Sequence, residues 1–254
     1  MRNKIFLGLS GFLGFVLLWT FYAYYLRYQN DPSLQFVPYP IAIVVAGYEQ
    51  LFQLSFWTAL VYSSYRVISA FLLSIMIGIP VGIFLGWWGI LRAILGPSFN
   101  FGRYLPVAAL VPLSIVILGV SDLQKIVVLF AGTLFHVIVM IEDAVARIPP
   151  NYIDTAKTMG FSSKQVATKV ILPSIYIAAY DAGRVAMGLC WSYLMVAEIV
   201  ASEKGVGYLI IKAQRFLQIE KLYFFIIVLG IIGLLFDLLF VFFKPRLFPW
   251  YTKK

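Results

Sequence analysis

Runs of about twenty apolar residues recur along this chain of 254 residues and restrict its fold more than any other feature. A helix needs roughly 20 mostly apolar residues to cross the hydrocarbon core of a bilayer. Charged residues make up only 12% of the chain, about half of the ~25% typical of soluble proteins, so they could not cover a soluble surface. The sequence therefore predicts an all-α membrane protein with six transmembrane helices, at Ile5–Leu26, Val67–Trp88, Tyr104–Val120, Ile126–Val145, Arg184–Ala201 and Leu222–Phe243.

The distribution of basic residues predicts the orientation. Arg2 and Lys4 precede the first apolar run, which exceeds the ~7–15 residues of a signal-peptide core and has no small-residue cleavage site after it. We therefore expect an uncleaved anchor and both termini in the cytoplasm, which places thirteen of the twenty Lys and Arg residues inside. The net charge of +9 then reflects orientation, and we expect no nucleic-acid partner. Pro38–Phe56 is interrupted by prolines and a glutamate, so we expect an interfacial helix within an N-terminal domain (1–58) that precedes a transmembrane core (59–254).

The second predicted span carries small residues four positions apart. In lipid, such residues let two helix backbones approach closely. We therefore expect a packing face at Ala70, Ser74, Gly78, Gly82 and Gly86. The third span contains Pro106 and Pro112. Proline kinks a helix, and kinks are tolerated at membrane depth beside protein or a water-filled cavity, so these two prolines are candidates for a solute pathway or gate.

The segment 147–181, between the fourth and fifth spans, is the longest predicted cytoplasmic loop. Two consecutive prolines end the preceding helix. We expect Asn151 to cap a short helix and Asp154 to lie at its third position, where a carboxylate meets free N–H groups. Gly160 is expected to end that helix, because glycine adopts a positive φ at no steric cost.

A second short helix is expected after this glycine. Ser162 and Gln165 form the S-x-x-Q pattern of a capping box, and Pro173 is expected to end the helix. Helices this short are marginal in water. Either a partner covers their apolar side chains or the loop folds back on the cytoplasmic ends of the bundle; the side chains in question are Tyr152, Met159, Phe161, Val166 and Val170.

The same loop resembles the EAA loop of ABC importer permeases, whose pattern is E-A-A, three residues, G, nine residues and I-x-L-P. The matching residues are Asp154-Thr155-Ala156, Gly160 and Val170-x-Leu172-Pro173. Asp replaces Glu, Thr replaces Ala and Val replaces Ile. These departures keep the sign of the charge, the small size and the branching of the side chain.

Further motifs extend the resemblance from about Arg66 to Phe243. Their order is similar to that of the nitrate, sulfonate, taurine and bicarbonate branch of these permeases. They are Ser64-Tyr65-Arg66-Val67, Gly78-Ile79-Pro80-Val81-Gly82, Tyr104-Leu105-Pro106, Val111-Pro112-Leu113, Gly119–Lys125, Val196–Ala201 and Gly205–Ile210.

The resemblance implies a type I ABC importer permease of MetI-like architecture in a bacterial inner membrane. In such importers two permease copies form the pore, a soluble binding protein delivers the solute from outside, and each EAA loop docks on a cytosolic ATPase subunit. ATP and Mg²⁺ bind to that ATPase, so this chain is expected to hold no cofactor or metal. The resemblance assigns ATPase coupling to Asp154, Thr155, Ala156, Gly160, Phe161, Val170, Leu172 and Pro173.

The resemblance also limits the solute. The related permeases carry small anions such as nitrate, bicarbonate, taurine or an alkanesulfonate. Some others carry a thiamine-precursor pyrimidine, so this alternative stays open.

Two carboxylates in or near the spans suggest a competing function, because charge at membrane depth is costly and is often functional. Glu198 either contacts a gate or the solute, or makes a structural hydrogen bond near the outer mouth. Asp237 lies within the last span. An ion-coupled secondary transporter could use both as relays, but that function would leave the cytoplasmic loop unexplained.

Other ionisable residues favour structural roles. We expect Asp181 and Arg184 to pair with each other, and Glu142-Asp143 to be solvated at a helix end. The single histidine, His136, and the single cysteine, Cys190, are expected to pack within spans. The sequence contains no G-x-S-x-G, H-E-x-x-H or P-loop pattern, so we expect no enzymatic activity of its own.

Overall fold

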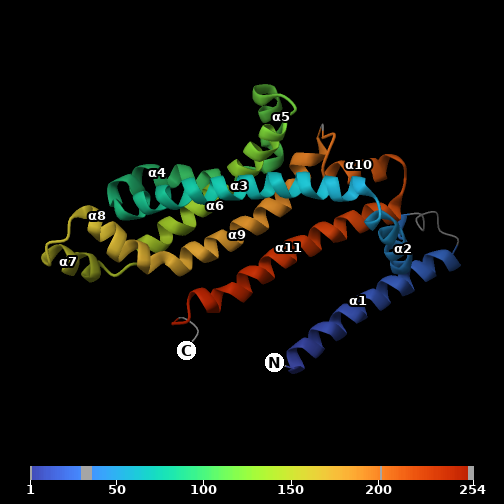
Figure 1. Ribbon diagram of the computed structural model, residues 1–254, viewed down its shortest axis with the longest axis horizontal. Helices are drawn as coiled ribbons and strands as arrows, with labels where there is room; N and C mark the ends of the chain where they lie inside the picture. The colour runs from blue at the N-terminus through green and yellow to red at the C-terminus, as the bar shows by residue number, and fades with distance from the viewer. Residues whose placement is uncertain (1, 30–35, 201, 251–254) are drawn as a thin grey trace. The chain divides into compact units, whose positions relative to one another are not determined.

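The computed structural model describes residues 2–29, 36–200 and 202–250, and every regular element in these ranges is a helix. Figure 1 shows the order of the elements along the chain. The chain divides into two compact units. Unit 1 combines Met1–Val61 with Glu203–Gly230, and unit 2 combines Tyr62–Ser202 with Ile231–Lys254.

Unit 1 holds the N-terminal helices and one later segment. Trp19 Nε1 donates to the carbonyl oxygen of Pro38 at 3.1 Å and thereby ties the first helix to the start of the second. Gly47 allows the backbone of the second helix to lie close to Phe224, because a Cβ at Gly47 would be 2.3 Å from the Phe224 ring. The complete helices of unit 1 are α1 (Arg2–Tyr28), α2 (Pro40–Leu51) and α10 (Val206–Arg215). Helix α2 lies inside the predicted interfacial segment.

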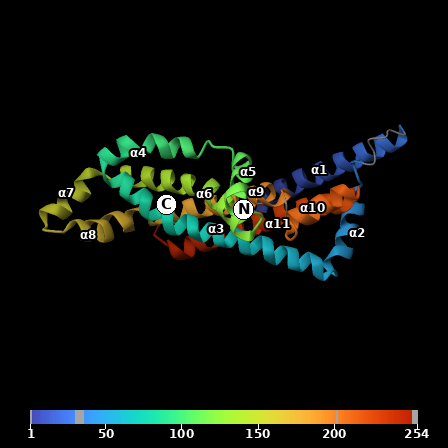
Figure 2. The same cartoon turned by 90° about the horizontal axis from the view of Figure 1, so that it is seen from above.

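Unit 2 is a bundle in which α6 and α9 lie side by side along much of their length (Figure 2). Helix α3 packs against α6 through its glycines, and the C-terminal part of α11 packs against α9. The bundle contains the whole of α4 (Gly89–Gly102), α5 (Val107–Leu118), α6 (Asp122–Ala146) and α9 (Leu172–Ile199). It also contains residues 62–87 of α3 (Leu54–Trp87) and residues 231–247 of α11 (Ile219–Leu247), whose other parts belong to unit 1.

Three of the described helices, α3, α6 and α11, are long and apolar enough to cross a membrane. A fourth span is possible if α4 and α5 count as one, although they are bent by 92° at the turn between them. The predicted span Tyr104–Val120 is therefore shorter than expected. Helix α5 has 12 residues, or ~18 Å of rise, against a hydrocarbon core of ~30 Å. Its start is set by Pro106, whose extended conformation precedes the first helical residue.

Two other spans begin earlier than predicted. Helix α3 begins at Leu54 rather than near Val67, and α9 begins at Leu172 rather than at Arg184. Proline is tolerated in a first helical turn, where its missing N–H is not needed, and Pro173 occupies that place in α9. Residue 201, the last of the predicted fifth span, lies outside the described residues.

The small residues of α3 face α6. A Cβ on Gly78 would lie 2.7 Å from Val137, and one on Gly86 would lie 2.6 Å from Val145. Ala70 and Ser74 are fully buried on the same stripe, and the Ser74 hydroxyl lies 2.6 Å from that of Thr133. The backbones of α3 and α6 therefore approach without intervening side chains.

Candidate functional site

The loop between α6 and α9 begins with α7 (Pro150–Thr158), which ends as the sequence predicted. Gly160 has φ +82°. Its N–H donates to Lys157 O at 2.9 Å, and the N–H of Phe161 donates to Ala156 O at 3.0 Å. These two bonds form a Schellman motif, which requires a left-handed residue at the position of Gly160.

The start of α7 differs from the expectation. Pro149 is the N-cap and Pro150 the first helical residue, so Asn151 lies inside the helix and caps nothing. Proline is favoured at the first helical position because its φ is already fixed. This shift moves Asp154 into the second turn, where it is exposed and no longer faces the free N–H groups.

The second loop helix, α8 (Ser163–Val166), begins with the predicted capping box. Gln165 N donates to Ser162 Oγ at 3.4 Å, and Ser162 N donates to Gln165 Oε1 at 2.8 Å. The expectation that Pro173 ends this helix is wrong. The chain continues through a π-helical segment, η2 (Ala167–Ile171), directly into α9.

The π turn accommodates the proline. Leu172 N–H bonds to Ala167 O, five residues back, and the Ser174 hydroxyl donates to Val170 O at 2.7 Å. A single inserted residue of this kind is typical of π-bulges, which are frequent at functional sites. The loop is therefore joined to α9 by helical hydrogen bonds rather than by a flexible hinge.

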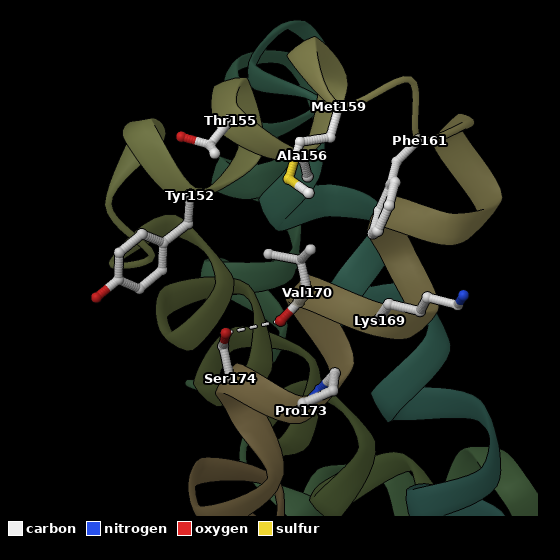
Figure 3. A pocket seen from close by; sticks show the side chains of 9 residues that line it. All are labelled: Tyr152, Thr155, Ala156, Met159, Phe161, Lys169, Val170, Pro173 and Ser174. Carbon is white, nitrogen blue, oxygen red and sulfur yellow. Dashed lines mark hydrogen bonds between the residues drawn. The ribbon is translucent and has the colours of Figure 1, made fainter.

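An open groove of about 530 Å³ lies between α7 and the η2–α9 junction. Figure 3 shows side chains of both walls around it. Tyr152 is 56% exposed and Met159 is 71% exposed, and Lys169 Nζ lies 5.6 Å from the centre of the Phe161 ring. The residues that line the groove are Tyr152, Thr155, Ala156, Met159, Phe161, Lys169, Val170, Pro173 and Ser174. The groove thus presents an apolar surface with one cation at its edge.

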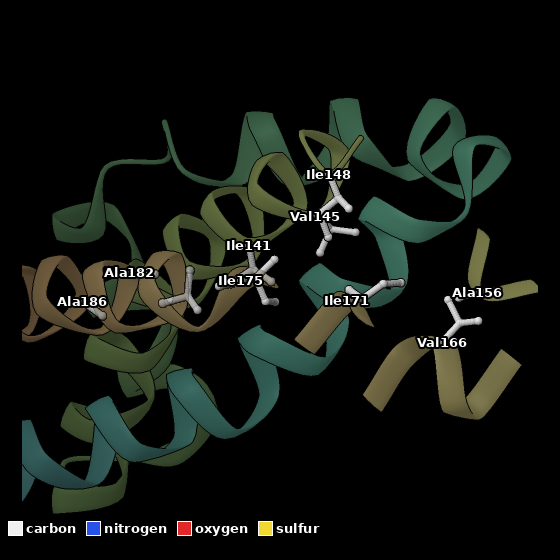
Figure 4. Close-up of a cluster of buried hydrophobic side chains, with 10 residues drawn as sticks. Ile141, Val145, Ile148, Ala156, Val166, Ile171, Ile175, Ala182 and Ala186 are labelled. Carbon is white, nitrogen blue, oxygen red and sulfur yellow. The ribbon is translucent and has the colours of Figure 1, made fainter. Parts of the chain in front are cut away.

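The other face of the loop is buried in the bundle. Ala156, Val166 and Ile171 belong to the same apolar cluster as residues of α6 and α9, which Figure 4 shows. Val166 and Ile171 have no exposed surface. The bundle therefore covers Val166, as the second of the two alternatives predicts. The two alternatives for the loop apply to different faces: one face folds back on the bundle, and the other leaves Tyr152 and Met159 uncovered.

The remaining residues assigned to coupling line or flank the groove. Thr155 is exposed on α7 and Leu172 is half-buried at the first residue of α9. Of the residues assigned to coupling, five line the groove and three are absent from its lining, namely Asp154, Gly160 and Leu172.

A second cluster lies where α3, α6 and α9 meet. Glu198 is fully buried and accepts hydrogen bonds from Ser63 Oγ at 2.8 and 2.9 Å and from Arg66 Nη1 at 2.6 Å. Arg66 Nε also donates to Asp122 Oδ1 at 2.9 Å. This geometry supports the structural alternative for Glu198. The proline candidates lie on α5: Pro106 is its N-cap and Pro112 is inside it.

A third cluster corrects the predicted pair of Asp181 with Arg184. Arg184 instead binds Asp237 of α11 through Nε and Nη2, at 2.5 and 2.7 Å. Asp181 binds Lys244 of α11 at 2.7 Å. The antiparallel packing of α9 and α11 supplies an opposite charge to each residue, and these interhelical pairs replace the pair along one helix.

Glu142 also differs from expectation, because it is buried rather than solvated. Arg92 Nε donates to Glu142 Oε1 at 3.0 Å and Arg92 Nη2 to Asp143 at 3.3 Å, so these pairs hold α4 on α6. His136 Nδ1 lies 3.0 Å from Gly132 O within α6, and Cys190 is buried with its Sγ 3.9 Å from Thr133 Oγ1. Among the described residues, no group of three acidic, His or Cys side chains could hold a metal ion.

Comparison with known proteins gives concordant matches. The family described as the inner membrane component of binding-protein-dependent transport systems matches residues 78–249. The bicarbonate transport permease CmpB of Synechocystis is 30% identical over 242 residues, which cover 93% of this chain and 86% of CmpB. The taurine transport permease TauC of Escherichia coli is 29% identical over 209 residues, which cover 82% and 76%.

A solved structure has a similar fold. A chain from inward-facing crystals of the MetNI methionine ABC transporter aligns with a TM-score of 0.65 at 20% sequence identity. The alignment covers 73% of this chain and 92% of that one. The MetI-like architecture implied by the sequence motifs is thus present in the structure.

Proposed function

We propose, from the premise that this chain belongs to the family of inner membrane components of binding-protein-dependent transport systems, that it imports a small oxyanion. The chain is the transmembrane permease of an ABC importer in the inner membrane. Its family acts with an ATPase and a binding protein. Bicarbonate for CmpB and the sulfonate taurine for TauC are both small solutes that carry an oxyanion group, which supports this solute class.

We infer that the coupling to the ATPase passes through the groove of α7 and η2. The observation that carries this inference is the two-faced loop: Val166 and Ile171 are buried in the bundle, while Tyr152 and Met159 remain exposed beside the groove. An exposed apolar surface rimmed by polar groups is typical of an interaction site. A push on this surface would be transmitted to α9, because η2 continues into it without a break.

The complete importer in this proposal contains two copies of the chain, each with six spans and cytoplasmic termini. Two cytosolic ATPase subunits bind the ATP and Mg²⁺. The arrangement leaves hydrolysis to the partner, and this chain supplies the pathway and the mechanical connection.

The proton-relay alternative has less support. Glu198 and Asp237 each form a salt bridge with an arginine, which gives both carboxylates a structural role. A relay residue must take up and release a proton during transport. The family assignment also requires an ATPase, which a secondary transporter does not use.

The coupling site can be tested by removing its exposed side chains. We expect Tyr152→Ala with Met159→Ala to leave membrane expression unchanged and to reduce co-purification of the cognate ATPase at least tenfold. Lys157→Ala is the matched control, because Lys157 is exposed on the same helix but does not line the groove. Full ATPase recovery with the double variant would refute docking at this groove.

A further inference from the structure

An ion pair lies within the apolar part of the α9–α11 contact. Arg184 Nε and Nη2 donate to the two carboxylate oxygens of Asp237, which is a bidentate arrangement. Asp237 is six residues from Phe243, the last apolar residue before Lys244, so it lies about 9 Å inside the end of the apolar run. The pair is therefore at membrane depth rather than at the headgroup level.

Aromatic contacts flank this pair on both sides. The rings of Trp191 and Phe236 are 5.7 Å apart toward one end of the contact, and those of Tyr180 and Phe240 are 5.2 Å apart toward the other. The Tyr180 hydroxyl also donates to Phe240 O at 2.8 Å. The two charges are thus enclosed along the helix axes by apolar layers.

The two side chains of the pair are, however, partly exposed on one side of the α9–α11 contact. The side chains of Arg184 and Asp237 are 39% and 41% exposed. Charged side chains at membrane depth face the interior of a bundle or a water-filled cavity and avoid lipid. This face of α9 and α11 must therefore meet water or protein in the working importer.

On α9, the strip next to the pair favours water. Gly188 and Ser192 follow Arg184 at intervals of four residues on α9, and both are exposed. A Cβ on Gly188 would meet no described atom within 4 Å, and the Ser192 hydroxyl bonds to Gly188 O at 3.0 Å. A small and polar strip of this kind would suit the wall of a solute pathway.

We propose that Arg184 is the oxyanion contact of the solute pathway and that Asp237 is its counter-ion when no solute is bound. This proposal rests on the proposed import of an oxyanion. A guanidinium group binds carboxylates and similar oxyanions through two parallel N–H···O bonds. Bicarbonate or a sulfonate can therefore take the place of the Asp237 carboxylate without moving Arg184. Exchange between the two anions keeps binding weak enough for release.

The same two helices provide a control pair. Asp181 and Lys244 are also joined between α9 and α11, at 2.7 Å, but Lys244 lies at the end of the apolar run. An ion pair at the membrane edge can be solvated and needs no pathway to explain it. Its removal, by Asp181→Asn with Lys244→Gln, is expected to change uptake less than twofold.

The test uses the full importer, with ATPase and binding protein, in proteoliposomes. Uptake of labelled bicarbonate, taurine and ethanesulfonate is measured beside ATP hydrolysis stimulated by the binding protein. For Arg184→Gln we expect uptake to fall at least tenfold while stimulated hydrolysis stays within twofold. Arg184→Lys keeps the charge but loses the bidentate geometry, and its maximal uptake rate is expected to fall several-fold.

A double apolar variant separates solute contact from a structural role. Replacing both partners of an ion pair with apolar residues often preserves stability, so Arg184→Met with Asp237→Leu is expected to assemble and yet to import no anion. Wild-type uptake by this variant, or by Arg184→Lys, would overturn the proposal and make the pair a structural contact, including one with a second copy of the chain. If the wild-type importer takes up none of the three anions, the proposed oxyanion function itself is wrong.

Discussion

Gly82 of α3 lies so close to α6 that a Cβ on it would be 2.7 Å from the carbonyl oxygen of Ile138. A backbone oxygen cannot rotate away as a side chain can. One of the two helices would have to move to make room for a methyl group. The contact between α3 and α6 therefore depends on the absence of a side chain at this position.

We expect Gly82→Ala to destabilise the detergent-solubilised protein by about 1–3 kcal/mol, the usual cost of overpacking. Gly82→Leu is expected to prevent assembly. Gly230→Ala is the matched control, because Gly230 is also helical and a Cβ there meets no described atom within 4 Å. Thermal unfolding measures both changes, and an equal melting temperature for Gly82→Ala and Gly230→Ala would contradict the packing argument.

In the buried Arg66–Glu198 pair, we expect replacement of Arg66 to cost more stability than replacement of Glu198. Arg66→Met removes the guanidinium that bonds to Glu198 at 2.6 Å in a fully buried site, and breaking a buried pair typically costs about 3–5 kcal/mol. Glu198→Gln is milder, because Arg66 keeps Asp122 and Ser63 can still donate. We expect low membrane expression for the first variant and near-normal expression with retained uptake for the second. Loss of uptake by a well-folded Glu198→Gln would favour the relay function instead.

Local patterns predicted much of the loop between α6 and α9. The positive φ of Gly160 and the capping box at Ser162 depend on residues within one or two turns, so the sequence contains the information directly. The errors at Asn151 and Pro173 concern a choice between two local roles. A proline that can end one helix can also begin another. At Pro173 the preceding π turn contains Ile171, which is buried among residues distant in the sequence.

The charged contacts were harder to predict because they join distant segments. Arg184 has one acidic residue three positions away and another more than fifty positions away, and helix packing selects the distant one. Arg66 does carry a usable signal: it is the single charged residue of α3, and a lone charge at membrane depth implies a counter-ion. The carboxylates that pair with Arg66 are identified only by the packing of α3, α6 and α9.

The last prediction isolates the backbone conformation of Gly160. A Cβ there would meet no described atom within 4 Å, so a substitution acts through its strain at φ +82° and not through a clash. That strain is ~1 kcal/mol for Ala and greater for a β-branched residue.

Gly160→Val should therefore insert and express normally, because Gly160 is exposed and does not belong to the buried cluster of the bundle. The two short helices of the loop have little stability of their own. The Schellman turn should therefore open, and the angle between α7 and η2 should change. We expect loss of ATPase co-purification and of stimulated ATP hydrolysis. Gly160→Asn is the matched control, since asparagine tolerates the left-handed conformation and should retain most of both activities. Asp154→Ala should have little effect, because Asp154 is exposed in the second turn of α7. Normal ATPase co-purification and stimulated hydrolysis with Gly160→Val would show that ATPase binding does not depend on the geometry of this turn.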